Sequence, residues 1–90
     1  MDCYRWDSTK NERLKAERGI GFERIVMHIE QGDLLGIYDH PNQAKYPDQR
    51  VFVVNVGNYA FPVPFVESKE GRFLKTIIPS RKATRDFLGV

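Results

Sequence analysis

The fold is decided by RFLKTIIPSRKATR, residues Arg72 to Arg85, in which an apolar run passes through Pro79 and Ser80 directly into a basic run. The Phe, Leu, Thr and Ile side chains of the first half suit a strand from Arg72 to Ile78, and Pro79 cannot donate to a continuing ladder. The Ser80 hydroxyl can accept a hydrogen bond from the first free N–H groups of a following helix. The segment therefore predicts a strand, a break and a short C-terminal helix.

Positive charge collects in the same part of the chain. Residues 46–90 contain seven Lys or Arg and four Asp or Glu, against seven and eight in residues 1–45, and the net charge is +2. Five of the basic side chains follow position 71, where Asp86 is the single acid. An excess of positive charge in one region favours a polyanionic partner.

The N-terminal third predicts two helices. Asp7 or Ser8 is a suitable N-cap for a first helix that runs to about Arg18, where Gly19 ends it. The second helix has the clearest periodicity in the chain, because apolar side chains recur at i, i+3, i+4 and i+7. These side chains are Phe22, Ile25, Val26 and Ile29. We expect this helix to be the main one on the sheet, with His28 on its flank in a structural role.

The remainder predicts about four antiparallel strands, at Leu34–Tyr38, Val51–Val56, Tyr59–Val66 and Arg72–Ile78. Gly36 indicates a bend or a close backbone approach, and Gly57-Asn58 is a two-residue hairpin signal. Pro62 and Pro64 lie on the same side of the pleat, so the donors that they lack would point to one neighbouring strand. That side of the ladder should be weak or bulged. Residues 39–49 have the composition of a surface loop.

The expected architecture is a single domain over residues 1–90. Its class is α+β in two layers, with two N-terminal helices, an approximately four-stranded antiparallel sheet and a short C-terminal helix. A composition of 41% hydrophobic and 29% charged residues is that of a globular rather than a disordered chain. The core of such a short chain is small, so we expect a partner to add to its stability.

Cysteine usage and hydropathy indicate the compartment. The single cysteine, Cys3, excludes an internal disulfide framework and is typical of a reducing environment. His28 and His40 have no close ligand spacing, so neither a metal nor another cofactor is expected. The apolar runs are too short to cross a bilayer, and the N-terminus lacks an apolar signal run. We therefore expect a cytoplasmic protein with no membrane partner.

Several local signatures occur together along the chain. They are Trp6-Asp7 followed by Lys10-Asn11, then Arg18-Gly19, Phe22-Glu23, Arg50 opening an apolar strand, and Ile77-Ile78 followed by Arg81-Lys82-Ala83-Thr84. In this combination the sequence resembles the BrnT toxins of bacterial toxin–antitoxin modules. The resemblance implies a RelE-like ribonuclease fold and RNA cleavage that arrests translation. It also implies neutralisation by a cognate DNA-binding antitoxin, with which the chain would form a hetero-oligomer.

The chain departs from the family pattern in three places. The segment 17–19 reads Glu-Arg-Gly where the family usually has Lys-His-Gly. Thr76 stands where the family has Arg, and Pro79-Ser80 stands where it has Ser-Ala. A histidine-based mechanism at the end of the first helix is therefore unavailable, and the chain resembles a divergent member of the family.

Metal-independent RNA cleavage needs three kinds of group. These are a base for the 2′-hydroxyl, cations for the charge that develops around phosphorus, and an acid for the leaving 5′-oxygen. Arg50 and Arg81 are predicted phosphate clamps, because a guanidinium binds phosphate bidentately and keeps its charge. Lys75, between apolar neighbours on the last strand, is a candidate acid or base if desolvation favours its neutral form. Glu67, near the end of the neighbouring strand, is a candidate base.

Further residues would assist binding. Arg72, Lys82 and Arg85 are expected to attract the RNA backbone without sequence preference. His40, in the long loop, is a second candidate acid. For each charged residue, the alternative is an ordinary ion pair on the surface.

A different class of function fits the same residues. The chain could be a non-catalytic protein- or RNA-binding module that uses its basic C-terminal strand–helix face. Tyr4 and Trp6 also allow two interpretations, since they could cover the small core or stack on bases.

Overall fold

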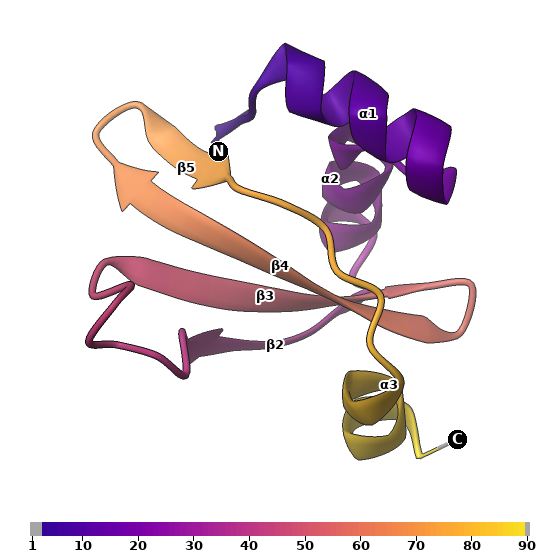
Figure 1. Cartoon of the computed structure of the whole chain (residues 1–90). Coiled ribbons are helices and arrows are strands. Elements are labelled where there is room, and N and C mark those ends of the chain that lie inside the picture. The colour runs from indigo at the N-terminus through magenta and orange to yellow at the C-terminus, as the bar shows by residue number, and fades with distance from the viewer. Residues whose placement is uncertain (1–2, 90) are drawn as a thin grey trace.

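The computed structural model describes residues 3–89, and within them three helices pack on a five-stranded sheet (Figure 1). The elements in chain order are β1 (Tyr4–Arg5), α1 (Ser8–Arg18), α2 (Phe22–Glu30), β2 (Leu34–Asp39), β3 (Gln49–Val56), β4 (Tyr59–Ser68), β5 (Gly71–Leu74) and α3 (Arg81–Leu88). The strands lie in the order β1-β5-β4-β3-β2. The α+β class, the two N-terminal helices and the short C-terminal helix are confirmed. Within the described residues, no helix is long and apolar enough to cross a membrane.

α1 begins and ends where the sequence indicated. The Asp7 carboxylate accepts a hydrogen bond from the Lys10 N–H at 3.0 Å, so Asp7 is the N-cap. Gly19 ends the helix with a φ of 71°, a left-handed conformation that glycine adopts at little cost.

The start of α2 is capped by a side chain from α1. Gly21 occupies the N-cap position and offers no side chain of its own. The Phe22 N–H instead donates to Asn11 Oδ1 at 2.7 Å, and Asn11 Nδ2 donates to Glu23 Oε2 at 3.0 Å. A Cβ on Gly21 would lie 2.7 Å from Asn11 Oδ1, so the contact requires glycine. One buried amide thus joins the two helices.

The sheet has one strand more than the predicted four. Tyr4 and Arg5 form β1, which pairs in parallel with Arg72 and Phe73 of β5. The Arg72 N–H also donates to the carbonyl of Cys3 at 2.8 Å. The sheet is therefore mixed, and the prediction of a purely antiparallel sheet is wrong. Two residues are too few to show the alternation that marks a strand in a sequence.

The last strand is shorter than predicted, because β5 ends at Leu74 rather than at Ile78. The cause lies in β4. The carbonyls of Pro62 and Pro64 accept hydrogen bonds from the N–H groups of Ile78 and Lys75, at 3.0 and 2.8 Å, but the prolines have no N–H to return. A regular antiparallel ladder needs bonds in both directions, so the strand ends at Leu74 although the residues that follow still donate to β4. The expected weakness on one side of the β4 ladder is confirmed.

Two glycine signals in the strands are also confirmed. The register of β2 against β3 shifts between Leu34 and Gly36, and a Cβ on Gly36 would lie 3.0 Å from the Phe87 ring of α3. Gly36 therefore marks both a bend and a close backbone approach. Gly57 and Asn58, with φ of 59° and 66°, close the β3–β4 hairpin as the left-handed pair of a type I′ turn.

Helices lie on both faces of the sheet, so the predicted two-layer arrangement is wrong. Figure 1 shows α1 and α2 on one side and α3 on the other. Adjacent strand residues face opposite sides, so Phe52 and Val54 pack under α1 and α2, whereas Val53 and Ala60 pack against Ala83 of α3. The larger core consists of Leu14, Ile20, Phe22, Ile25, Phe52, Val54, Val56, Val63, Phe65, Leu74 and Ile77.

One hydroxyl group caps α3 and a second fixes the helix to β4. Ser80 is the N-cap, as predicted, and its Oγ accepts from the Ala83 N–H at 3.0 Å. The Thr84 hydroxyl accepts from the Ala60 N–H of β4 at 2.9 Å and donates to the Ser80 carbonyl at 2.8 Å. These bonds hold the start of α3 beside the β3–β4 hairpin.

Candidate functional site

Three of the predicted site residues meet at one end of the sheet. Glu67 of β4 pairs with Arg72 of β5, and Arg50 of β3 pairs with Phe65, two positions before Glu67. Glu67 Oε1 lies 3.3 Å from Arg72 Nε and 3.9 Å from Arg50 Nη1. One carboxylate therefore lies between two guanidinium groups.

Asp39 extends this cluster to the edge strand β2. It lies opposite Arg50 in the register, and its Oδ1 is 3.6 Å from Arg50 Nε. Asp39, Arg50, Glu67 and Arg72 alternate in sign across four strands, and we call them the charged row. Their side chains are between 25% and 76% exposed, so solvent and ligands reach them. Exposed ion pairs contribute little stability, and an incoming anion can replace a carboxylate partner.

An aromatic pair beneath the row positions Arg72. The rings of Phe52 and Phe65 stack with centroids 3.9 Å apart and an interplanar angle of 10°. The Arg72 guanidinium carbon lies 5.4 and 5.8 Å from the two centroids, which is within cation–π range. Both rings are fully buried. They therefore orient the guanidinium but are not open to a base.

Tyr4 and Trp6 cover the core. The Tyr4 ring meets Phe52 edge-on at 6.3 Å, and the Trp6 ring stacks on Phe22 at 5.7 Å. Of the two interpretations of these residues, the structure supports the one in which they complete the core.

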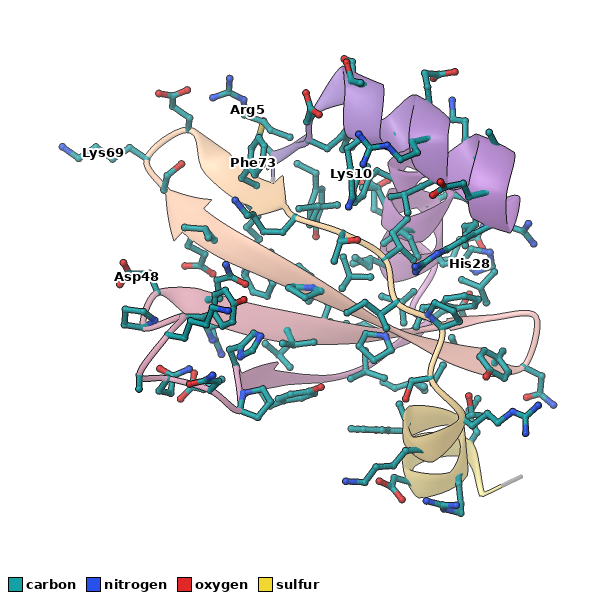
Figure 2. All side chains as sticks on the ribbon, viewed as in Figure 1. Arg5, Lys10, His28, Asp48, Lys69 and Phe73 are labelled. Carbon is teal, nitrogen blue, oxygen red and sulfur yellow. The ribbon has the colours of Figure 1, made fainter. Side chains whose placement is uncertain are left out.

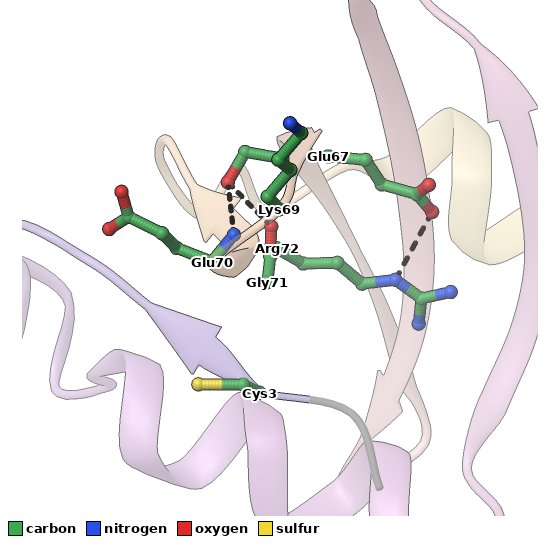
Figure 3. Close-up of a pocket in the computed structure, with 7 residues that line it drawn as sticks. Cys3, Glu67, Lys69, Glu70, Gly71 and Arg72 are labelled. Atoms are coloured by element: carbon green, nitrogen blue, oxygen red, sulfur yellow. Dashed lines mark hydrogen bonds and ion pairs between the residues drawn. The ribbon is translucent and has the colours of Figure 1, made fainter.

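A cavity of about 320 Å³ opens beside the charged row, at the turn between β4 and β5. Its walls are Cys3 and residues 67–72. Figure 3 shows the side chains of Glu67 and Arg72 joined along one side of the cavity, with Lys69 on the turn. The Ser68 hydroxyl donates to the Gly71 carbonyl at 3.1 Å and holds the turn.

Lys75 does not belong to this cluster. It follows the end of β5, its side chain is exposed, and its Nζ lies 5.4 Å from the centroid of Phe73. Phe73 and Arg72 are neighbours on a strand and so face opposite sides of the sheet. The expectation that Lys75 is desolvated inside a strand is therefore wrong.

Arg81 and Arg85 line a second cavity, of about 410 Å³. Its other walls come from the β3–β4 hairpin and α3, at Asn58, Tyr59 and Thr84.

This second cavity lies far from the charged row. The pairing of β3 with β4 ends at Val56 opposite Tyr59, and Val56 is six residues beyond Arg50, which corresponds to roughly 20 Å of strand. Figure 2 shows Lys69 and Asp48 at the other end of the sheet, where the row lies. The structure therefore does not bring Arg81 to Glu67.

Lys82 lines a third cavity, of about 490 Å³, between α3 and the strands β2 and β4. Tyr38 and Phe87 are among the residues that line it. Partial burial raises the pKa of the Tyr38 phenol. The predicted basic face is thus divided among three places, with Arg72, Arg85 and Lys82 at different cavities.

The two histidines are engaged in local structure. His28 Nδ1 lies 2.7 Å from Asp33 Oδ2 at the end of α2, which confirms its structural role. His40 Nδ1 accepts a hydrogen bond from the Asn42 N–H at 3.0 Å, and its ring lies 4.5 Å from that of Tyr46. His40 therefore organises the loop between β2 and β3.

Sequence reasoning missed Asp39 and the contacts around Glu23. The sequence predicts a loop that begins at residue 39, whereas β2 extends through Asp39. An acid and a base that flank a hairpin loop are potential cross-strand partners, and this signal could have linked Asp39 to Arg50. Glu23 accepts hydrogen bonds from Asn11 and from Lys15 Nζ, the latter at 3.2 Å. The bond from Asn11 is the largest cause of the lowered pKa of Glu23.

Several residues of the family-like signatures have structural roles. Asp7 caps α1, Asn11 caps α2, Trp6 packs on Phe22, and Ala83 lies in the smaller core. These residues bear on the fold rather than on the chemistry of the charged row. Comparisons of the chain with protein-family models, with curated proteins and with solved structures found no match.

Proposed function

We propose that the protein is the toxin of a bacterial toxin–antitoxin module, an endoribonuclease that cleaves RNA without a metal ion and inhibits translation. The observation that carries the proposal is the Glu67 carboxylate between the guanidinium groups of Arg50 and Arg72. A base between two permanent cations suits the attack of a ribose 2′-hydroxyl on the adjacent phosphate.

Binding begins with exchange of ion-pair partners at Arg50. Its nearest carboxylate, Asp39, is 76% exposed and 3.6 Å away, so the pair is weak. A phosphate can bind the guanidinium bidentately and displace Asp39. Arg72, stacked over two buried rings, offers a second and more rigid contact. The scissile phosphate is thus bound by two guanidinium groups, one on each side of the Glu67 carboxylate.

Cleavage then follows from the charges around the phosphate. Glu67 takes the proton of the 2′-hydroxyl, the 2′-oxygen bonds to phosphorus, and the bond from phosphorus to the 5′-oxygen breaks. Arg50 and Arg72 stabilise the charge on the non-bridging oxygens. Lys69, the ammonium group that lines the same cavity, gives a proton to the 5′-oxygen. The products are a 2′,3′-cyclic phosphate and a 5′-hydroxyl.

The assignment to a toxin rests on the resemblance of the signatures to BrnT, and with it we assign the α+β fold to the RelE-like class. A cognate antitoxin is the expected partner and the cytoplasm the place of action. β2 is an edge strand that exposes 39% of both Ile37 and Tyr38. A segment of the antitoxin added there would cover apolar surface and unpaired backbone together.

Single-turnover cleavage of a labelled RNA, with a binding titration at the same salt concentration, tests the proposal. Glu67→Gln should slow cleavage by about 100-fold or more, because a general base is lost. RNA binding should persist, since the substitution removes a negative charge. Glu30→Gln, at an exposed acid of α2, is the matched control and should cleave like the parent. Equal cleavage by the Glu67→Gln variant and the parent would reject Glu67 as the base.

The exposed apolar side chains of β2 also favour a second function, that of a non-catalytic module that recruits a protein or RNA. The same experiment separates the two. A module of this kind would bind RNA or a partner protein but leave the labelled RNA intact under all conditions.

A further inference from the structure

The cavity at the β3–β4 hairpin has its own chemistry, separate from that of the charged row. Arg81 and Arg85 are one turn apart on α3 and therefore lie on the same face of the helix. Thr84, between them, is bonded to both Ala60 and Ser80, so its hydroxyl forms a fixed wall. Both arginines and Tyr59 line this one cavity.

Within residues 3–89, carboxylates neutralise the positive charge of this cavity only in part. Among residues 3–89, no carboxylate forms an ion pair with Arg81. Arg85 is 70% exposed, and its one ion pair in the described part of the chain is with Asp86, at the long distance of 3.9 Å. Arg81 also begins α3, where the free N–H groups and the helix dipole add to the attraction of an anion. Two arginines arranged in this way suit a phosphate group.

The tyrosine adds a flat wall to the anion site. Tyr59 is partly buried, and Phe61 supports it edge-on, with centroids 5.5 Å apart and an interplanar angle of 61°. A supported, accessible ring beside basic side chains can stack on a nucleobase. Near the charged row, by contrast, the Phe52 and Phe65 rings are fully buried. The volume of about 410 Å³ lies in the range of small-molecule sites, roughly 300–1,000 Å³.

We propose that this cavity binds a nucleotide, with the phosphate between Arg81 and Arg85 and the base against Tyr59. The nucleotide is either a free mononucleotide or one unit of an RNA strand. The site does not require the charged row to cut RNA, because the two lie at opposite ends of the β3–β4 pair. Its failure can therefore be distinguished from failure of the proposed nuclease function.

Calorimetric titrations at fixed salt concentration test the site with four probes: uridine monophosphate, inorganic phosphate, uridine and a short RNA. We expect the monophosphate to bind at least about fivefold more tightly than either phosphate or uridine, because both parts contribute. Arg81→Gln and Arg85→Gln should each weaken nucleotide binding by about tenfold. Tyr59→Leu should weaken the binding of the nucleotide by about fivefold and leave the binding of inorganic phosphate unchanged.

Controls separate this site from the rest of the surface. Arg13→Gln removes an exposed arginine of α1, on the other face of the sheet, and should not change binding. Arg81 and Arg85 are exposed, so their variants should keep the melting temperature of the parent.

The outcomes have distinct meanings. Loss of mononucleotide binding in the Arg81→Gln variant supports the site with a free nucleotide as ligand. If Arg81→Gln weakens only the binding of the short RNA, the site is supported with a nucleotide of an RNA strand as its ligand. Equal effects of Arg81→Gln and Arg13→Gln on every probe would overturn the site. Equal affinity for phosphate and nucleotide, unaffected by Tyr59→Leu, would overturn the nucleotide as its ligand.

Discussion

The backbone N–H of Phe22, at the start of α2, donates to the side chain of Asn11 on α1 at 2.7 Å. Asn11 is only 3% exposed, so its removal leaves the Phe22 N–H without a partner at a buried position. We expect Asn11→Ala to lower the free energy of unfolding by about 2 kcal/mol, because a buried donor and a helix cap are lost together. Urea unfolding followed by circular dichroism measures the change. Asn42→Ala, in the exposed loop, should change the free energy by less than about 0.5 kcal/mol, and equal losses at the two positions would contradict the buried cap.

The Asn11 side chain also makes the free energy of unfolding depend on pH in the acid range, through its hydrogen bond to Glu23. The hydrogen bond from Asn11, then the backbone bond to Glu23 and the interactions with Lys15, place the pKa of Glu23 below its ordinary value of 4.5. A carboxylate with a lowered pKa in the folded state adds stability that is present above the unfolded pKa and is lost as pH falls through the folded pKa. The free energy of unfolding should therefore fall between about pH 5 and pH 3, and it should fall less in Glu23→Gln.

Urea unfolding at the two ends of that pH range checks this. Glu30→Gln, at an exposed acid on the same helix, should lose as much stability as the parent. If Glu23→Gln loses as much as Glu30→Gln over the same range, Glu23 does not contribute to the pH dependence.

Local chemistry made much of the fold predictable. The period of apolar residues predicts α2, the Gly57-Asn58 pair predicts the β3–β4 hairpin, and Ser80 predicts the start of α3. Each of these signals acts within a few residues of its cause, so one sequence suffices to identify it. β1 has two residues and is fixed by β5, more than sixty positions later in the chain, so no local pattern marks it.

The candidate site depends on register, and register is not local. Arg50, Glu67 and Arg72 are near each other because of how three strands align. Arg81 is equally basic, but α3 packs at the hairpin end and on the other face of the sheet. The sequence identifies the residue types suited to phosphate, but it does not show which of them share a site.

The pairing of β1 with β5 requires that residue 71 has no side chain. Its φ is 116°, and a Cβ would collide with the carbonyl of Cys3, which accepts the Arg72 N–H. We expect Gly71→Ala to detach β1 and to lower the free energy of unfolding by about 3 kcal/mol. Hydrogen exchange at the Arg72 amide should report the loss of β1. Gly57 also has a positive φ, but a Cβ there would meet no other atom, so Gly57→Ala should lower the free energy of unfolding by only about 1 kcal/mol. Equal losses for the two variants would show that the structure adjusts to avoid the collision at residue 71.

Growth on induced expression separates the charged row from the other basic residues. Arg50→Ala and Lys75→Ala each remove one exposed positive charge, but only Arg50 lies beside Glu67. If the row cuts RNA, the parent should stop growth and reduce incorporation of labelled amino acids before DNA synthesis falls. Arg50→Ala should restore both growth and incorporation, because a phosphate contact and a stabilising charge are lost, and Arg50→Lys should restore them only in part. Lys75→Ala should remain as toxic as the parent at equal soluble expression. Relief by Lys75→Ala as complete as that by Arg50→Ala would mean that general positive charge, rather than the carboxylate between two guanidinium groups, causes the arrest.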